Sequence, residues 1–474
     1  MNREITQLLD STMVVPTTAH VRDTTTMNKN YLLIFLFLTT VSTTVGAAEG
    51  QPANLLQLYD LALTTNPIVE GRRYSIMQAE AQKDQARSKL LPQASATGFI
   101  SWNELTQENT NAFTRQTTDF TSQYQGLRGV VQARQALFDL ASYRAYEGAG
   151  FTIKQAEQDL ADARMSLATD VVDRYLEFLQ ATDEAGYLQG ELDLTDGDTQ
   201  RIRRLYERAM AKITDLYEVE AYYQTLKTRE LEIRNLQAVA LEKIREVVGI
   251  SVADLTRLTK EELPSVPGQS DQWVANAVTH HPAIHALQHA MDAAAKTIAS
   301  QWANHLPLVS LQMSGIYAKN GGFDNRQLDP YTVGTLGLQL NMPLYSGGSV
   351  KAGEREAIAR FEMTKYKHMQ KQREIERETR TAYLNAQTGY SRIASTAREV
   401  EARVKARDGQ QRGYELGAAT IVALLESKKN LLKSRFAYAK ARYDYIRSLV
   451  ALRVWGGTLS RSDLEEINSW LARN

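Results

Sequence analysis

The sequence predicts a mixed α+β membrane protein in which one chain carries the same set of long helices and strands twice, and several chains pool their strands into one β-barrel. Three observations predict this fold class. They are a secretory signal with no other apolar span, an internal repeat, and four strand patterns beside very long helical patterns. The chain of 474 residues has 55 basic and 55 acidic side chains and no cysteine. This balance does not indicate a nucleic-acid partner, and the missing cysteine excludes disulfides and thiolate metal sites.

The N-terminal part has the pattern of a targeting segment. Residues 27–47 combine Lys29, the apolar run YLLIFLFL and a small-residue exit, which is typical of a secretory signal peptide. We expect the mature chain to start near Ala48. Residues 1–26 are expected to be a non-native upstream extension, with a real N-terminal tail as the alternative. The rest of the chain has no stretch apolar enough for a membrane helix, so insertion would require a barrel.

The chain behind the signal repeats itself. Asn-Pro at 66–67 recurs as His-Pro at 281–282, and Leu-Pro at 91–92 recurs as Leu-Pro at 306–307, both 215 residues later. Farther on, YERAMAKITDL (206–216) recurs as YELGAATIVAL (414–424), 208 residues later. These offsets predict a first repeat, a linker, a second repeat and a C-terminal segment, which we place at residues 48–249, 250–272, 273–457 and 458–474.

Each repeat contains the same elements in the same order: a helical stretch, a Leu-Pro pair, two strands around a polar loop, and long helices. The strands are expected where apolar and polar residues alternate, as at Leu336, Leu338 and Leu340. Their expected bounds are about 93–102, 122–138, 308–318 and 331–343. The long helices are expected over 140–249 and 348–456, and the polar loops over 103–120 and 319–330.

The helical patterns are unusually long. No proline interrupts the run from Gly348 to Arg412, and a helix of that length would measure close to 100 Å. Between Leu216 and Val247 the apolar residues keep a spacing of three and four, which is typical of a coiled-coil seam. The last long helix carries two adjacent apolar stripes, which predicts packing against two neighbours, as in the wall of a cylinder. The core of an ordinary helix bundle is the alternative.

Prolines and glycines mark the joints between strands and helices. Pro92 and Pro307 are expected at the two passages from helix to strand. At the passage from strand to helix, Pro343 cannot donate to a sheet, and Gly347 and Gly348 tolerate unusual backbone angles. The first repeat has ALFDLAS at this place, so Asp139 or Ser142 is expected to cap the helix there.

Four strands cannot close a barrel by themselves. The smallest single-chain membrane barrels need about eight strands, and open edges invite further pairing. Three chains would supply twelve strands, with the apolar face toward lipid and the polar face toward water. A soluble sheet of two hairpins packed on the helices is the alternative.

Several motifs together resemble those of the TolC-like trimeric outer-membrane channels of Gram-negative bacteria. They are the two-copy order, the Leu-Pro pairs, MPLYSGG, YELGAATIVALLE and the closing ARYDYIRSLVALRVWGGTLSRSDL. The resemblance implies a homotrimer in which a twelve-stranded β-barrel in outer-membrane lipid continues into a helical coiled-coil tunnel across the periplasm. An equatorial belt would then contain residues 250–272 and 458–474. The implied function is the exit duct of a tripartite efflux or type I secretion system, with a periplasmic adaptor and an inner-membrane transporter as partners.

The resemblance also implies an entrance at the two helix turns. Thr214, Asp215 and Tyr414 match the family's latch residues, and Glu426 matches one of its two entrance acids. The other entrance acid and the latch arginine are replaced by alanines, at 423 and 419, so one carboxylate ring and part of the latch are expected to remain. Acid rings favour cations in a pore. The alternative is that Asp215 caps its helix and Glu426 belongs to a solvated face.

No motif predicts an enzyme, a metal site or a bound cofactor. His281, His285 and His289 recur every four residues, but HExxH is absent, and we expect solvent-facing histidines at a helix start rather than zinc ligands. GGSVKAGER lacks the spacing of a phosphate-binding loop, so an energy source must lie in a partner. A periplasmic coiled-coil adaptor and a secreted structural protein are the alternative functions, and neither explains all the features.

Overall fold

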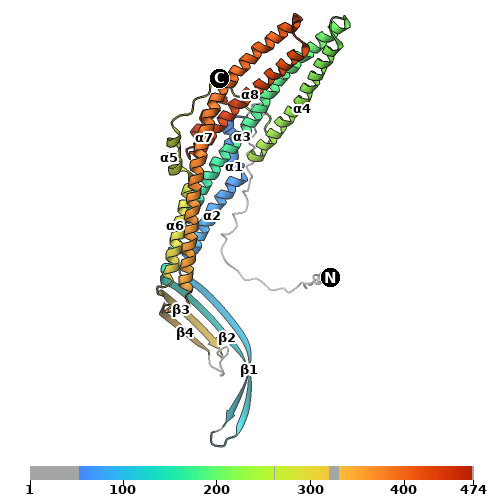
Figure 1. Ribbon diagram of the computed structural model, residues 1–474. Helices are drawn as coiled ribbons and strands as arrows, with labels where there is room; N and C mark the ends of the chain where they lie inside the picture. Colours follow the sequence, from blue (N-terminus) through green and yellow to red (C-terminus); the bar gives the residue numbers. More distant parts are fainter. Residues whose placement is uncertain (1–52, 111, 261, 320–329, 472–474) are drawn as a thin grey trace, which may run out of the picture. The chain divides into compact units, whose positions relative to one another are not determined.

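The computed structural model describes residues 53–110, 112–260, 262–319 and 330–471. This part of the chain consists of helices and one antiparallel sheet (Figure 1). The expected upstream extension (1–26) and signal peptide (27–47) lie outside the described residues, as does most of the polar segment 319–330. None of the described helices combines the length and the apolar character that a membrane crossing requires.

The two repeats match element by element. The first contains α1 (Leu55–Thr65), α2 (Pro67–Ser88), β1 (Gln93–Thr110), β2 (Thr117–Phe138), α3 (Leu140–Glu207) and α4 (Ile213–Val248). The second contains α5 (Ser270–His280), α6 (Pro282–Ala303), β3 (Leu308–Lys319), β4 (Tyr331–Asn341), α7 (Ser349–Glu415) and α8 (Ile421–Trp455), and α9 (Arg461–Leu471) follows. Corresponding helices have 11, 22, 68 and 36 residues in the first repeat and 11, 22, 67 and 35 in the second. The helical plan is therefore the same in both halves.

The sheet has the strand order β1-β2-β3-β4, and every neighbouring pair is antiparallel. The pairing of β2 with β3 joins the first repeat to the second. The expected loop over 103–120 is wrong for most of its length, because β1 continues to Thr110 and β2 begins at Thr117. Threonine suits strands. Here the Oγ1 atoms of Thr106 and Thr121 lie 3.4 Å apart across the ladder, and those of Thr110 and Thr117 lie 3.1 Å apart.

The joints between sheet and helices use different devices in the two repeats. Gly347 and Gly348 have φ of 61° and 84°, and Gly348 is the N-cap of α7. In the first repeat Asp139 caps α3, and its Oδ1 accepts a hydrogen bond of 2.9 Å from the Ser142 amide. β4 ends at Asn341, two residues earlier than expected, just before Met342 and the proline that cannot donate. At the same end of the sheet, Pro92 and Pro307 directly precede β1 and β3.

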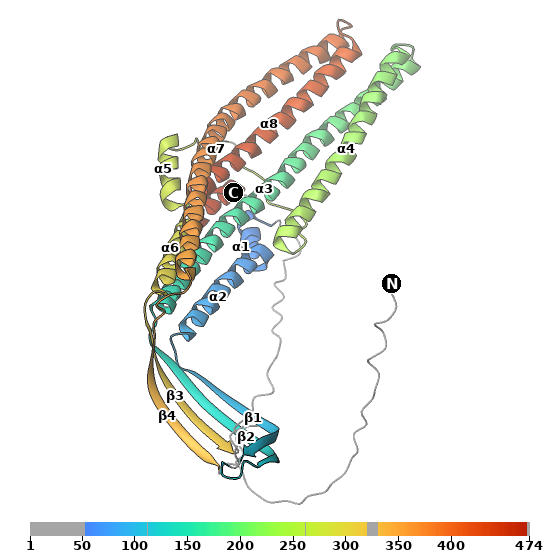
Figure 2. The ribbon, with the colours of Figure 1, turned by 60° about the horizontal axis from the view of Figure 1, so that its bottom comes forward.

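The long helices α3 and α7 each pack against successive shorter helices. Near the sheet, α3 contacts α2 and α6, and toward the other end it contacts α4 and α8 (Figure 2). α6 and α8 also contact α7, so each of them lies between the two long helices. The two-neighbour packing predicted for the last long helix is therefore correct, with α7 and α3 as its neighbours. The predicted seam of α4 is buried at Leu216, Val219, Leu226, Ile233, Ala240, Ile244 and Val247.

The largest buried cluster lies at the middle of the helices. There α1, α9 and the linker after α4 pack against α3 and α8. Backbone groups of the linker are hydrogen-bonded from several sides. The Tyr175 hydroxyl donates to Thr256 O (2.7 Å), the Thr259 amide to Trp470 O (3.0 Å) and Arg442 Nη2 to Lys260 O (2.7 Å). We name this cluster the belt, and it fixes an irregular segment that has little regular structure of its own.

His281 is buried, so the expectation of a solvent-facing histidine is wrong at this position. Its side chain is 3% exposed, lies 6.2 Å from the Trp455 ring centroid and accepts a hydrogen bond from the Ala283 amide as the N-cap of α6. Asn66 has the same capping role for α2. Burial lowers the pKa of His281 to about 4, and the charge of Lys371 acts in the same direction. The tertiary contact with α8, which the local pattern does not reveal, decides the burial.

The two turns at the far helix ends share one left-handed backbone position but have different residues there. Ala209 in the first turn and Gly417 in the second occupy equivalent places, with φ of 60° and 75°. A residue with a Cβ atom is disfavoured in this left-handed conformation. No neighbouring atom crowds Gly417, so the backbone angle alone favours glycine there.

We expect Ala209→Gly to stabilise the protein by about 1 kcal/mol, because relief of the left-handed strain exceeds the entropy cost of glycine. The reciprocal change Gly417→Ala should destabilise it by a similar amount. Denaturant unfolding of both variants, followed by circular dichroism, measures the pair. Equal midpoints for Ala209→Gly and the parent protein would contradict this account of the turn.

We expect folding stability to decrease as the pH falls from about 6.5 to about 4. Over this range the unfolded chain protonates residue 281 and the folded chain does not, so stability decreases by at most about 1.4 kcal/mol per pH unit. His281→Asn should flatten this dependence, because asparagine retains the capping oxygen that Asn66 supplies in the first repeat. His280→Asn, which changes an exposed neighbour, is the control. The measurement is the denaturant unfolding midpoint of each variant at several pH values. If the midpoints of His281→Asn and His280→Asn changed equally with pH, residue 281 would not be the source of the pH dependence.

Candidate functional site

The ends of the two helix hairpins, α3–α4 and α7–α8, pack against each other within one chain. A buried apolar cluster joins them. It comprises Ile202, Leu216, Val219, Ile421, Leu424 and Leu425, with Tyr414 packed at its edge. Because residues of α3, α4 and α8 meet here, the two turns that the sequence analysis placed at an entrance belong to one packed unit.

Tyr414 and Asp215 are neighbours in this unit, whereas Thr214 points outward. Tyr414 and Asp215 are both half-buried, and Thr214 is exposed. Burial raises the pKa of Tyr414, and the nearby carboxylate of Asp215 raises it further. Within the described residues no hydrogen bond joins the Tyr414 hydroxyl to Asp215. The structure therefore brings two of the three predicted latch residues together without bonding them.

The structure also bears on the alternatives for Asp215 and Glu426, which are a helix cap and a solvated helix face. Asp215 lies in the first turn of α4, where an acid suits the helix dipole, but the N-cap is Lys212 and no side chain caps this helix. In the second repeat Thr420 caps α8 through a 3.2 Å hydrogen bond from the Ala423 amide. Glu426 is exposed on α8 and accepts from Asn430 Nδ2 at 3.4 Å. An exposed carboxylate fits either a pore ring or a solvated helix face.

A buried ion pair that the sequence analysis missed connects α3 to α8. Lys428 Nζ lies 2.5 Å from Asp198 Oδ2, and the two side chains are 4% and 20% exposed. A lysine within a charged helix resembles a surface residue in the sequence, so no local pattern identifies it. Removing one partner of a buried pair costs about 3–5 kcal/mol, since the other charge is left without compensation.

An arginine from α3 extends this contact to α7. Arg201 Nη2 lies 3.1 Å from Asp198 Oδ1, and Arg201 Nη1 lies 3.8 Å from Glu415 Oε1, next to Tyr414. Position 419, which the motif resemblance matched to a latch arginine, holds alanine, and Arg201 supplies a guanidinium near Tyr414 from another helix. We name Asp198, Arg201, Tyr414, Glu415 and Lys428 the entrance cluster. It links the first hairpin to the second by charge.

Next to the entrance cluster, α3 buries further polar groups. Glu191 and Thr195 are 3% and 0% exposed, and with Asp198 they follow one face of the helix. Burial raises the pKa of Glu191, and the ammonium group of Lys428 opposes this. Tyr222 lies beside this carboxylate, and burial together with the charge of Glu191 raises the pKa of its hydroxyl. A buried carboxylate and buried hydroxyls need hydrogen-bond partners, so this end of the helices depends more on polar contacts than an apolar core does.

The arrangement offers positioning and charge rather than covalent chemistry. Among the residues that the structure describes, no group of three or more histidine and acidic side chains could hold a metal ion. His281 serves as a helix cap, and His289 Nδ1 lies 3.7 Å from Asp292 Oδ2 on the same helix. The entrance cluster connects the two helix hairpins through ion pairs.

Comparisons with known proteins identify relatives over most of the chain. The alkaline protease secretion protein AprF of Pseudomonas aeruginosa is 26% identical over 420 residues, which cover 87% of this chain and 86% of that protein. The outer membrane protein TolC of Escherichia coli is 24% identical over 443 residues, covering 90% and 86%. Among solved structures, the CmeC outer membrane channel of Campylobacter jejuni superposes with a TM-score of 0.73 at 17% identity, covering 88% of this chain and 89% of that one. This likeness shows a shared fold.

The family comparison agrees with the resemblance drawn from the motifs. The family described as outer membrane efflux protein matches two segments of the chain, residues 58–250 and 273–458. Each match covers most of one repeat, so the evidence for the family comes from both halves. The chain belongs to the outer membrane efflux protein family.

Proposed function

We propose that this protein is the exit duct of a tripartite efflux or type I secretion system, a homotrimer that passively conducts substrates through the outer membrane. The observation that carries the proposal is that the packing between the two repeats inside one chain can continue between chains. Membership of the outer membrane efflux protein family supports the same function. The relatives named for protease secretion and outer-membrane location agree with it.

The sheet supplies the first part of this reasoning. Within the described residues β2 and β3 are paired on both sides, whereas β1 and β4 each have one open edge. Unpaired strand edges are favourable partners for further strands. The pairing of β4 with β1 of the next chain would repeat the β2–β3 junction, and three chains would close a barrel of twelve strands.

The helices supply the second part. α6 packs between α3 and α7, whereas among the described helices its counterpart α2 packs extensively against α3 and not against α7. The outer sides of these helices expose apolar residues, among them Tyr74 and Met77 on α2 and Met363 and Tyr366 on α7, each more than half exposed. Docking of α2 against α7 of the next chain would cover them in the way that α6 is covered within the chain. The resulting ring is closed and head-to-tail.

One face of the sheet suits lipid. Ile100, Trp102, Val131, Leu336, Leu338 and Leu340 alternate with polar residues along the strands and are 54–80% exposed. Such a band of large apolar side chains is costly in water and favourable in a bilayer. We place this face against outer-membrane lipid and the opposite face around a water-filled lumen.

The hairpin ends would then form the periplasmic entrance. We propose that an adaptor and an inner-membrane transporter dock there and open the duct by moving the hairpins apart. Transport energy comes from the transporter, and no bond-making chemistry is assigned to this chain. The roles of Thr214, Asp215 and Tyr414 in a latch, and of Glu426 as an acid ring, are part of this proposal. Family membership argues against the alternatives of an adaptor or a secreted structural protein.

The ring is testable by disulfide cross-linking, since the natural chain has no cysteine. We expect cysteine at Thr97 on β1 to cross-link with cysteine at 337, 339 or 341 on β4 of the next chain, giving covalent dimers and trimers on a denaturing gel. Cysteine at Leu338 or Leu340 is the control, because these side chains face the other side of β4. Absence of cross-links at all three positions would exclude the edge pairing.

The duct itself is tested with protein extracted in mild detergent from outer-membrane fractions. A native mass three times that of the mature chain, together with ion conductance in planar bilayers, is the expected result. A monomer without conductance would remove the proposed function.

We expect Lys428→Met to loosen the entrance. The variant loses the buried tie between α3 and α8, while Asp198 keeps Arg201, so the stability cost should be at or below about 3 kcal/mol. Single-channel conductance in bilayers and antibiotic leakage in cells should both rise. Lys429→Met, which changes the exposed neighbour on α8, should leave both unchanged. Equal conductance of the two variants would show that the ion pair does not restrict the entrance.

A further inference from the structure

The sheet has one face whose charge is of a single sign. The register places its residues in rows across the four strands. Starting at the helix end, the rows are Gln93–Arg134–Gln312–Gly337, Ser95–Gln132–Ser314–Thr335, Thr97–Val130–Ile316–Val333 and Phe99–Arg128–Ala318–Tyr331. Two arginines of β2, Arg128 and Arg134, are the charged members of these rows. The first two rows are otherwise almost entirely amides and hydroxyls.

In the described parts of the four strands, this face has no acid to balance these arginines. The acidic residues that the structure places in the strands, Glu104, Glu108 and Asp119, belong to the opposite face by strand alternation. Arg128 and Arg134 are both exposed, and no ion pair reaches either guanidinium within the described part of the chain. A positive charge that is exposed and unpaired is available to a ligand.

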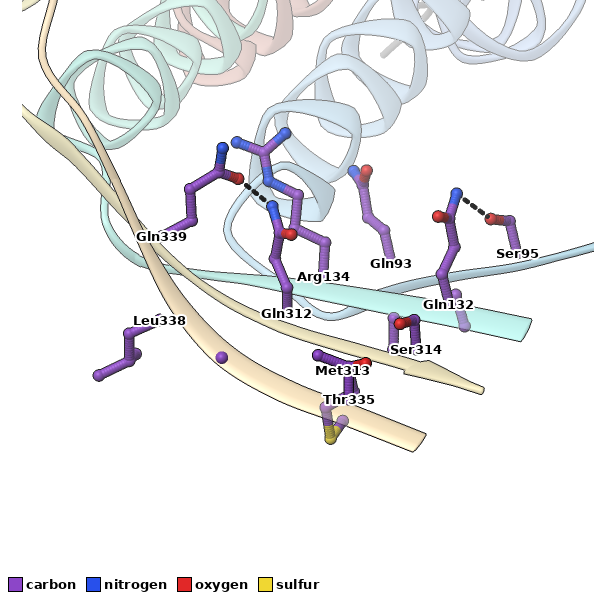
Figure 3. Close-up of a pocket in the computed structure, with 13 residues that line it drawn as sticks. Gln93, Ser95, Gln132, Arg134, Gln312, Met313, Ser314, Thr335, Leu338 and Gln339 are labelled. Carbon is purple, nitrogen blue, oxygen red and sulfur yellow. Dashed lines mark hydrogen bonds between the residues drawn. The ribbon is translucent and has the colours of Figure 1, made fainter. Parts of the chain in front are cut away.

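The surroundings of Arg134 form a polar hollow at the base of the sheet. Figure 3 shows Arg134, Gln93 and Gln312 rising from the same side of the sheet, with Leu338 directed to the other side. The hollow has a volume of about 560 Å³. Gln312 donates to Gln339, and Gln132 Nε2 donates to Ser95 Oγ at 3.1 Å, so hydrogen bonds hold part of the lining of the hollow in place. The hollow therefore combines bonded amide side chains with the exposed guanidinium of Arg134.

We propose that Arg128 and Arg134 make the barrel lumen selective for anions and give it binding sites for carboxylate groups of the transported substrate. The inference rests on the proposed trimeric duct and specifies its substrate class. Three chains would contribute six guanidinium groups and no carboxylate to this part of the lumen. Guanidinium binds carboxylate through two parallel hydrogen bonds, and rings of arginine favour anions in pores. An acidic peptide or protein segment therefore fits the lumen better than a basic one.

The two ends of the duct then differ in sign. Glu426 would place three carboxylates at the entrance, and the arginines act at the barrel. Removing each charge should move the ion selectivity in opposite directions. This opposition separates the arginine effect from a general loss of pore structure.

The experiment measures reversal potentials of the full trimer in planar bilayers under a potassium chloride gradient. Arg128→Gln combined with Arg134→Gln should lower the chloride-to-potassium permeability ratio severalfold, whereas Glu426→Gln should raise it. Lys319→Gln is the matched control, because it removes one positive charge from the opposite face of the neighbouring strand. Arg128→Lys with Arg134→Lys should retain the parent ratio and shows whether the barrel tolerates substitution. A parent-like ratio in the glutamine double variant would overturn the inference.

A hexaglutamate peptide tests the binding of carboxylate groups. It should block the current of the parent channel reversibly, and the block should be much shorter in the glutamine double variant. A hexalysine peptide should show no such difference between the two channels. Equal block by hexaglutamate in both would refute the substrate class. Complete absence of conductance in the parent protein would instead overturn the proposed duct and this inference with it.

Discussion

The unmade backbone hydrogen bonds at the edges of β1 and β4 are the constraint on which the rest of the structure depends. In the described part of the chain, strands of the two repeats pair once, through β2 and β3, and β1 and β4 each keep an open edge. The helices show the same incompleteness, because α6 lies between two long helices and α2 beside only one. The proposed ring would resolve both by repeating the internal junction between chains. Closure of the sheet would then determine where the helices of neighbouring chains lie.

Much of this architecture could be predicted from the sequence, because prolines and long apolar periodicities act locally. Pro92, Pro307 and the glycine pair after β4 mark the joints between sheet and helices. The long helices α3 and α7 each run without a break. The parts that could not be predicted depend on tertiary contacts. The threonine-rich end of the first hairpin resembles a loop until its partner strand lies beside it, and the burial of His281 depends on Trp455. The pairing of Lys428 with Asp198 requires knowledge of which face of a 68-residue helix meets α8.

The two repeats are equal in their helices and unequal in their joints and turns. The first has an aspartate cap at the sheet, Ala209 in a left-handed turn and no side-chain cap on α4, whereas the second has two glycines, Gly417 and a threonine cap. The first hairpin of strands is also the longer one. The entrance cluster connects the two repeats near these unequal turns, since Arg201 of the first repeat reaches Glu415 of the second. Specialisation thus lies in the connections between common helices.

The unbroken course of α3 and α7 has a mechanical consequence. Each is roughly 100 Å long at the usual rise per residue, and each is held near its middle by the belt. A rigid rod fixed near its centre is a lever with that point as fulcrum. A small tilt at the belt produces a displacement at the hairpin end that grows with the length of the arm. A partner that pulls on a hairpin end would therefore act on the few contacts of the entrance cluster through a long arm. The sheet, at the end of the other arm, resists this tilt because its strands are bonded side by side, so a pull on a hairpin end would bend the long helices at the belt and move the arm beyond it.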